Sequence, residues 1–384
     1  MLDQAGDYRK LHLRLDGHKW SLCPCPELTA YWTPPPSWPR RILCESKYFS
    51  GSLTKNCWII LVTLLLTYFF IMDVFLFDRF RTADLVKDSR AGSPDEIYTP
   101  FTHLSIKGLL NDHPSQFIIA PSTEYFELLT HFSSVFYFIS PNMISAAHLI
   151  CGFLSGKLMS SDHLYDRRIG VVLFEFRTWL DAFDGTVHRA QAGLHLQYHS
   201  NHSTSGYIID STFDTLGGCF LSFGIFFYLL KRFRSPKSPP PAWPKQENSI
   251  EVGVEEPVRT CSDGYSVKYL FWKAFSFGLC LGVAAKGWDQ AVEDFSQVFQ
   301  VQLENPTKSL LQFNLCHSYS SIILFYLWRL FGGQSILNYI LIAIYMDKTW
   351  EFLRYTQWIL LGVASVLFAV TTLYIHHVKG LLLL

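Results

Sequence analysis

Long apolar runs alternate with polar segments along the chain, and each run is close to the length of a membrane-spanning helix. A helix needs about 20 apolar residues to cross a hydrocarbon core of ~30 Å. The runs are residues 58–77, 141–159, 169–188, 207–230, 269–287, 309–331, 335–346 and 358–378. Because the run 335–346 is too short to cross alone, we expect seven spans, with eight as the alternative. The pattern predicts an all-α, polytopic membrane protein.

The polar segments divide the chain into four predicted regions. These are a polar N-terminal segment, an N-terminal transmembrane helix, a second polar segment and a membrane core, at residues 1–55, 56–77, 78–140 and 141–380. The first is rich in proline and is expected to be extended. In the third, apolar and polar residues mix from 117 to 138, which predicts a helix lying in the membrane interface. A basic, proline-rich loop at 231–268 interrupts the core.

Composition narrows the functions that the chain can have. The 32 basic residues balance the 32 acidic ones, so the formal net charge is zero. This balance excludes a protein that is held to nucleic acid or anionic lipid by bulk charge. Nine cysteines in 384 residues do not indicate a disulfide framework. No apolar signal-peptide region occurs in residues 1–30, so the first span is expected to remain as an anchor.

Four aspartates at the ends of two neighbouring spans carry the chemical signal. Asp181 and Asp184 lie near the end of the third span, and Asp210 and Asp214 lie near the start of the fourth. Residues three or four apart share one helical face. Because consecutive spans run antiparallel, the four carboxylates are expected to meet at one level of the membrane. A charged residue there costs roughly 2.5–3.5 kcal/mol on insertion scales, so the group needs a partner.

A divalent metal is the partner that these residues favour. Arg177 and Arg189 cannot neutralise four aspartates, whereas one or two divalent cations can. Ligation by oxygen alone favours Mg²⁺ or Mn²⁺ over zinc, and such ions stabilise charge on phosphate oxygens. Gly185 and Gly206 would let a phosphate or nucleotide approach the backbone closely. The alternatives are a proton or ion pathway, or hydrogen bonds that pack helices together.

The two halves of the motif have a long and specific spacing. They read Asp181-x-x-Asp184-Gly185-x-x-His188-Arg189 and Gly206-x-x-x-Asp210-x-x-x-Asp214. This spacing resembles the signature of the CDP-alcohol phosphotransferases, and the span that starts at Pro141-Asn142 is similar to the first core helix of that family. The resemblance covers roughly residues 140–380. It implies a six-helix core, to which this chain adds one N-terminal transmembrane helix.

The resemblance also implies a role for individual residues. The metal ligands would be Asp181, Asp184, Asp210 and Asp214, around two ions. Asp214 would also be the general base that takes the proton of the acceptor hydroxyl. The nucleotide would contact Asn142, Gly185, Arg189 and Gly206. Glu175 and Arg177 lie deeper in the third span, where they would meet the acceptor or pair with polar neighbours.

Two features depart from the family pattern. His188 stands where the family usually has alanine, so it would alter the cytidine site, donate to a phosphate in catalysis, or be a bystander. The spacer between Arg189 and Gly206 is roughly twice as long as is usual in the family. It contains His195, His199 and His202, which could recruit a metal or simply be polar.

Basic residues indicate the side of the membrane on which the motif lies. They gather at the opposite ends of the two spans, at Arg167, Arg168, Lys231, Arg232, Arg234 and Lys237, whereas the loop 189–206 contains Arg189 alone. Cytoplasmic loops carry an excess of Lys and Arg. The motif is therefore expected to face the lumen, with the N-terminus cytosolic and residues 78–140 lumenal. The sequon Asn201-His202-Ser203 could be glycosylated only on that side, which is weak support.

A lumenal site narrows the acceptor. The extra span, the long spacer and His188 are similar to the branch of the family that transfers phosphoethanolamine from CDP-ethanolamine to ceramide, with release of CMP. That branch implies a Golgi membrane, Mn²⁺ rather than Mg²⁺, partners among membrane lipids and no nucleic acid, and it is compatible with a homodimer. The alternatives are an ethanolamine- or cholinephosphotransferase acting on diacylglycerol, a transporter that uses the aspartates as an ion site, and a non-catalytic scaffold.

Overall fold

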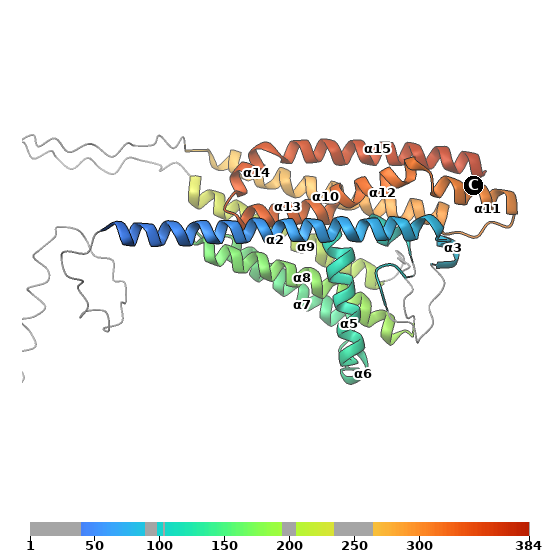
Figure 1. Ribbon diagram of the computed structural model, residues 1–384, viewed down its shortest axis with the longest axis horizontal. Coiled ribbons are helices and arrows are strands. Elements are labelled where there is room, and N and C mark those ends of the chain that lie inside the picture. The colour runs from blue at the N-terminus through green and yellow to red at the C-terminus, as the bar shows by residue number, and fades with distance from the viewer. Residues whose placement is uncertain (1–39, 89–97, 103, 194–204, 234–263, 384) are drawn as a thin grey trace, which may run out of the picture. The chain divides into compact units, whose positions relative to one another are not determined.

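The computed structural model describes residues 40–88, 98–102, 104–193, 205–233 and 264–383 of the 384-residue chain. The contacts divide the chain after Leu65, and every contact given below lies within residues 66–383. The described residues are almost entirely helical and contain no strand (Figure 1). The predicted all-α class is therefore confirmed.

The helices follow one another with short connections. They are α2 (Arg40–Thr82), α3 (Leu85–Asp88), α4 (Ile106–Leu110), the π-helix η2 (Ser115–Ile119), α5 (Ala120–Thr130), α6 (Phe132–Val135), α7 (Pro141–Met159), α8 (Leu164–Gln191), α9 (Ser205–Phe233), α10 (Val267–Phe299), α11 (Pro306–Cys316), α12 (Tyr319–Phe331), α13 (Gly333–Tyr345), α14 (Thr349–Tyr355) and α15 (Gln357–Leu382).

Five stretches of the described helices are long and apolar enough to cross a membrane. They are Ile59–Thr82, Ile208–Phe233, Val267–Phe299, Tyr319–Tyr345 and Gln357–Leu382. The chain is therefore a multi-pass membrane protein, as predicted. The other two expected spans are the helices α7 and α8, which are less uniformly apolar, so the total of seven spans stays a prediction.

Two predicted boundaries differ from the structure. Helix α2 begins at Arg40, inside the segment 1–55 that was expected to be extended. It starts directly after Pro39, the last residue of the proline-rich stretch, and no proline follows to interrupt it. The apolar run 309–331 is also not one helix, because Ser318 caps a new helix by accepting a hydrogen bond from the backbone N–H of Ser321.

The segment expected to lie in the interface forms two short helices, α5 and α6. They meet at His131, whose φ of 48° is left-handed and ends α5. Large apolar side chains on this segment are exposed, among them Leu129 and Tyr137, each 80% exposed. An exposed apolar surface of this kind agrees with contact to lipid, although the placement in the interface stays a prediction.

Helices α7, α8 and α9 pack very closely, and α7 lies against both of the others (Figure 1). A Cβ atom on Gly224 would lie 2.4 Å from the carbonyl oxygen of Gly156, and one on Gly156 would lie 2.5 Å from the carbonyl oxygen of Phe220. Only glycine permits backbones to approach so closely at these two positions. Ser155 fixes α8 to the same helix, since its hydroxyl donates to the carbonyl of Gly170 at 2.8 Å.

A buried ion cluster joins the second half of α2 to the core. Arg329 of α12 is fully buried and donates from Nη2 to Oδ1 of Asp73 at 2.9 Å. The other carboxylate oxygen of Asp73 lies 2.7 Å from Nε2 of His113. Because an uncompensated charge in the interior is costly, this cluster ties α2, α12 and the segment before η2 together.

The contact between α7 and α9 gives a test of the fold. The variant Gly224→Ala places a methyl group against the backbone of Gly156. We expect it to destabilise the protein by about 1–3 kcal/mol, the usual cost of overpacking. Thermal unfolding of the purified protein in detergent would measure the loss.

Gly282→Ala on α10 is the matched control, because nothing lies within 4 Å of a Cβ atom at that position. This control should unfold at or slightly above the wild-type temperature, since alanine favours a helix over glycine. Equal unfolding temperatures for the two variants would contradict the close contact between α7 and α9.

Candidate functional site

Three helices contribute to a cluster of metal-ligating side chains. His148 comes from α7, Asp181 and Asp184 come from α8, and Asp210 comes from α9. One ligand atom of each residue lies within 4.8 Å of the ligand atoms of the other three. The structure thus brings together three of the four aspartates that the motif predicts as ligands, and it adds a histidine.

The close packing of the three helices explains this convergence. Asp181 and Asp184 are nearly one turn apart on α8, and Asp210 lies in the first two turns of α9. The face of α7 that covers them consists of small and polar residues at helical spacing, namely Ser145, His148, Gly152, Ser155 and Gly156. All five are buried, so α7 can come close enough to place its polar groups beside the carboxylates.

Several polar atoms of the cluster are buried without a hydrogen bond. They are both ring nitrogens of His148, Oδ1 of Asp181 and Oδ1 of Asp210. Nδ1 of His148 lies 3.2 Å from Oδ1 of Asp181, an ion-pair distance, but the two atoms lack hydrogen-bond geometry. Leaving such groups unpaired costs about 1–3 kcal/mol each, and more for charged groups. Unpaired oxygen and nitrogen donors around one centre fit a bound divalent cation.

Asp184 and Asp214 have protein partners, and these partners set the two residues apart. The hydroxyl of Ser145 donates to Oδ2 of Asp184 at 2.5 Å, so this carboxylate is fixed from α7. Asp214 instead forms an ion pair with Arg177 and does not belong to the cluster of four. Arg177 itself is buried against Gly217, where a Cβ atom would lie 3.0 Å from its Nη2 atom.

The remaining predicted residues lie around this centre in different states. Arg189 donates to Oε1 of Glu124 at 2.5 Å and to the hydroxyl of Thr186 at 3.1 Å, so α5 holds it. His188 is exposed and is not one of the clustered ligands. Asn142 is exposed in the first turn of α7.

The glycines and the acceptor-side residue differ in their surroundings. A Cβ atom on Gly206 would meet nothing within 4 Å, whereas one on Gly185 would lie 3.4 Å from Nη1 of Arg189. Glu175 is half-buried in α8. The predicted glycosylation site Asn201 and the histidines of the spacer fall outside the described residues.

Reasoning from the sequence missed His148, Ser145 and Glu124. Glu124 pairs with Arg189 across 65 positions of sequence, and no local pattern indicates that pairing. For His148 and Ser145 a signal existed. The stripe of small and polar residues along α7 interrupts an apolar run at helical spacing, which is typical of a helix face that packs closely against polar neighbours.

The fold defines an all-α, multi-pass membrane protein, and the site is a buried set of carboxylates and one imidazole that could hold a metal ion. The family model for ceramide phosphoethanolamine synthase matches residues 50–383. The chain therefore belongs to the ceramide phosphoethanolamine synthase family. It is 31% identical over 272 residues to the ceramide phosphoethanolamine synthase of Drosophila melanogaster, an alignment that covers 70% of this chain and 67% of the relative. No solved structure matches the chain.

The cluster predicts where a metal ion binds. Replacing Asp184 by asparagine removes one negative ligand without changing the size of the side chain. We expect Asp184→Asn to weaken Mn²⁺ binding by about tenfold or more, as for changes close to a metal. Titration of the purified protein with Mn²⁺, followed through the EPR signal of the free ion, measures the affinity.

Asp162→Asn is the control, because this exposed aspartate lies in the connection before α8, away from the cluster. Its affinity for Mn²⁺ should equal that of the wild type. An unchanged affinity in the Asp184 variant would show that Mn²⁺ binds elsewhere.

Proposed function

We propose that the protein transfers phosphoethanolamine from CDP-ethanolamine to the primary hydroxyl of ceramide and releases CMP, as a CDP-alcohol phosphotransferase of sphingolipid biosynthesis. The observation that carries this proposal is the meeting of Asp181, Asp184 and Asp210 at one centre, in a chain of this family. The two motif halves that resemble the CDP-alcohol phosphotransferase signature supply those residues. The name of the Drosophila relative supports ceramide and phosphoethanolamine as the transferred partners.

A divalent ion, Mn²⁺ or Mg²⁺ and in this proposal two ions, would be held by the aspartates of the cluster. Bound there, such ions neutralise the negative charge of a pyrophosphate. The protein residues have the task of fixing the ligands in place. Ser145 does so for Asp184 through its hydrogen bond of 2.5 Å.

Asp214 is proposed as the general base. Its side chain is 44% exposed, whereas the Asp184 carboxylate is buried, so Asp214 is the aspartate that an acceptor can reach. Its ion pair with Arg177 fixes the direction of the carboxylate. As the ceramide oxygen bonds to the β-phosphorus, the bond from that phosphorus to the CMP oxygen breaks and the hydroxyl proton passes to Asp214.

The nucleotide is proposed to bind on the exposed side of the cluster. Asn142 at the start of α7 and the open position Gly206 at the start of α9 both belong to this end of the three helices. Gly185 and Arg189 follow the clustered aspartates on α8. Because Glu124 already holds Arg189, the guanidinium would approach a phosphate as part of that pair.

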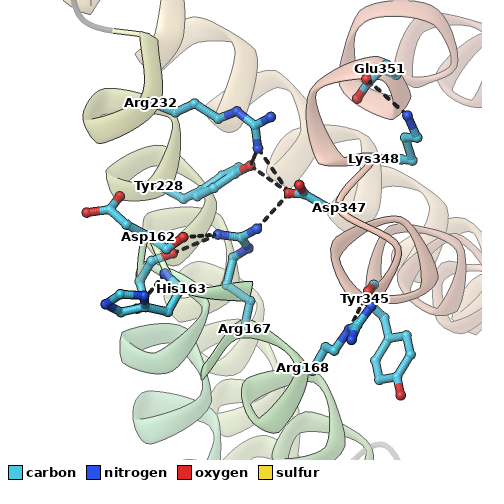
Figure 2. A network of polar contacts seen from close by, with 11 residues as sticks. Asp162, His163, Arg167, Arg168, Tyr228, Arg232, Tyr345, Asp347, Lys348 and Glu351 are labelled. Atoms are coloured by element: carbon cyan, nitrogen blue, oxygen red, sulfur yellow. Dashed lines mark hydrogen bonds and ion pairs between the residues drawn. The ribbon is translucent and has the colours of Figure 1, made fainter. Parts of the chain in front are cut away.

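Charged residues at the other end of the three helices support a lumenal site. Figure 2 shows the side chains of Arg167, Arg232 and Tyr228 turned toward the carboxylate of Asp347, with distances of 2.6, 3.0 and 3.1 Å to its Oδ1 atom. Arg167 lies seventeen residues before Asp184 on the same helix, about 25 Å along the axis. That length approaches the thickness of the hydrocarbon core.

The basic end is proposed to face the cytosol, because cytoplasmic ends of spans carry excess Lys and Arg. The metal cluster would then open to the lumen of the Golgi, and the N-terminus would be cytosolic. A lumenal site receives ceramide from the same leaflet, which agrees with ceramide rather than diacylglycerol as the acceptor.

Lipid products identify the reaction. The protein would be synthesised without cells into liposomes that contain ceramide and diacylglycerol, with CDP-ethanolamine, CDP-choline and Mn²⁺ added. We expect mass spectrometry to detect ceramide phosphoethanolamine. Product on diacylglycerol alone would contradict the acceptor and the lumenal site. No product with any pair of substrates would contradict the proposed transferase activity.

The role of Asp214 gives a second test in the same assay. Asp214→Asn keeps the shape of the side chain but removes the base, so the turnover number should fall by at least about 100-fold. Mn²⁺ binding should change much less, because Asp214 lies outside the cluster of four. Asp162→Asn should retain full activity. Wild-type turnover in the Asp214 variant would remove the general-base assignment.

A further inference from the structure

His148 is the most deeply buried member of the metal cluster, and the motif does not include it. Its side chain is 0% exposed, and neither of its ring nitrogens has a hydrogen bond. Buried polar groups almost always have partners, because an unpaired donor or acceptor in the interior is costly. A histidine in the core that served only packing would be expected to donate its ring N–H to a carbonyl or carboxylate.

The surroundings of the ring indicate what is missing. Nδ1 lies 3.2 Å from Oδ1 of Asp181, and one nitrogen belongs to the set of ligand atoms that lie within 4.8 Å of one another. The ring of Phe213 meets the imidazole in an edge-to-face contact, with 6.2 Å between the ring centres. Phe213 thus restricts the ring from the α9 side, while a nitrogen remains directed at the carboxylates of Asp181, Asp184 and Asp210.

We propose that His148 is a nitrogen ligand of the metal ion, and that it is the residue by which the site selects Mn²⁺ and other first-row ions over Mg²⁺. This proposal depends on the proposed function only in requiring that a divalent ion occupies the cluster. Three aspartates alone would give an all-oxygen site. Adding one imidazole converts it into a mixed site of oxygen and nitrogen donors.

The chemistry of the two ions explains the selection. Mg²⁺ is a hard ion that is bound through carboxylates, phosphates and water, and it loses its water reluctantly. First-row transition-metal ions also accept imidazole, which is a poor replacement for water on Mg²⁺. A buried ring that approaches from α7 therefore occupies a coordination position that Mn²⁺ can use better than Mg²⁺ can.

Pulsed EPR of the Mn²⁺-loaded protein tests the ligand directly. An imidazole nitrogen bound to Mn²⁺ produces nitrogen modulations in the electron spin echo, and carboxylates do not. We expect these modulations in the wild type and their loss in His148→Asn, which keeps a polar side chain in the core. His188→Asn, a change of an exposed histidine in the same motif, should leave them unchanged.

A second variant avoids any change in the packed core. Replacing His195, His199 and His202 together by asparagine removes the histidines of the spacer and leaves His148 in place. The nitrogen modulations should persist in this triple variant. Their loss there, their persistence in His148→Asn, or their absence from the wild type would overturn the proposal.

Affinities give an independent measure of selection. We expect His148→Asn to reduce the ratio of Mn²⁺ to Mg²⁺ affinity by about tenfold. The affinity for Mn²⁺ comes from EPR titration and that for Mg²⁺ from competition with Mn²⁺. An unchanged ratio would contradict the role in selection.

The liposome assay separates this proposal from the proposed function. If the wild type makes ceramide phosphoethanolamine but shows no bound nitrogen, the function stands and the role of His148 falls. If nitrogen is bound but no lipid product forms, the metal ligand stands and the transferase proposal falls.

Discussion

Negative charge buried between three helices is the constraint on which the rest of the site depends. Asp181, Asp184 and Asp210 lie close together in a part of the protein with little water, and Arg177 is engaged by Asp214 rather than by the cluster. Carboxylates in this position repel one another unless a cation lies between them. The unpaired oxygen atoms of the cluster show that protein donors do not supply that compensation.

The packing of the helices creates this constraint and also makes it useful. Glycines at the contact between α7 and α9 allow backbones to approach to a distance that no other residue permits. That approach places Ser145 and His148 of α7 against the aspartates of α8 and α9. At the other end of the same helices, Arg167 and Arg232 share the single carboxylate of Asp347. Opposite signs of charge therefore mark opposite ends of one three-helix unit.

The sequence predicted the helical class because runs of about 20 apolar residues have few alternatives to a membrane helix. It also predicted which aspartates lie together, since Asp181, Asp184 and Asp210 occupy fixed positions on two neighbouring helices. It failed where contacts join distant segments, as for His148 and for the pair of Glu124 with Arg189. It also failed at the start of α2, because polar residues after the last proline can extend a helix beyond the hydrocarbon core.

Anomalous X-ray scattering at the manganese edge would test the metal site most directly. Crystals of the protein grown with Mn²⁺ would locate the ion without assumptions about its ligands. The geometry of the cluster predicts an anomalous peak among the side chains of Asp181, Asp184 and Asp210. A strong peak at another position, with none between these three aspartates, would contradict the site and the function proposed from it.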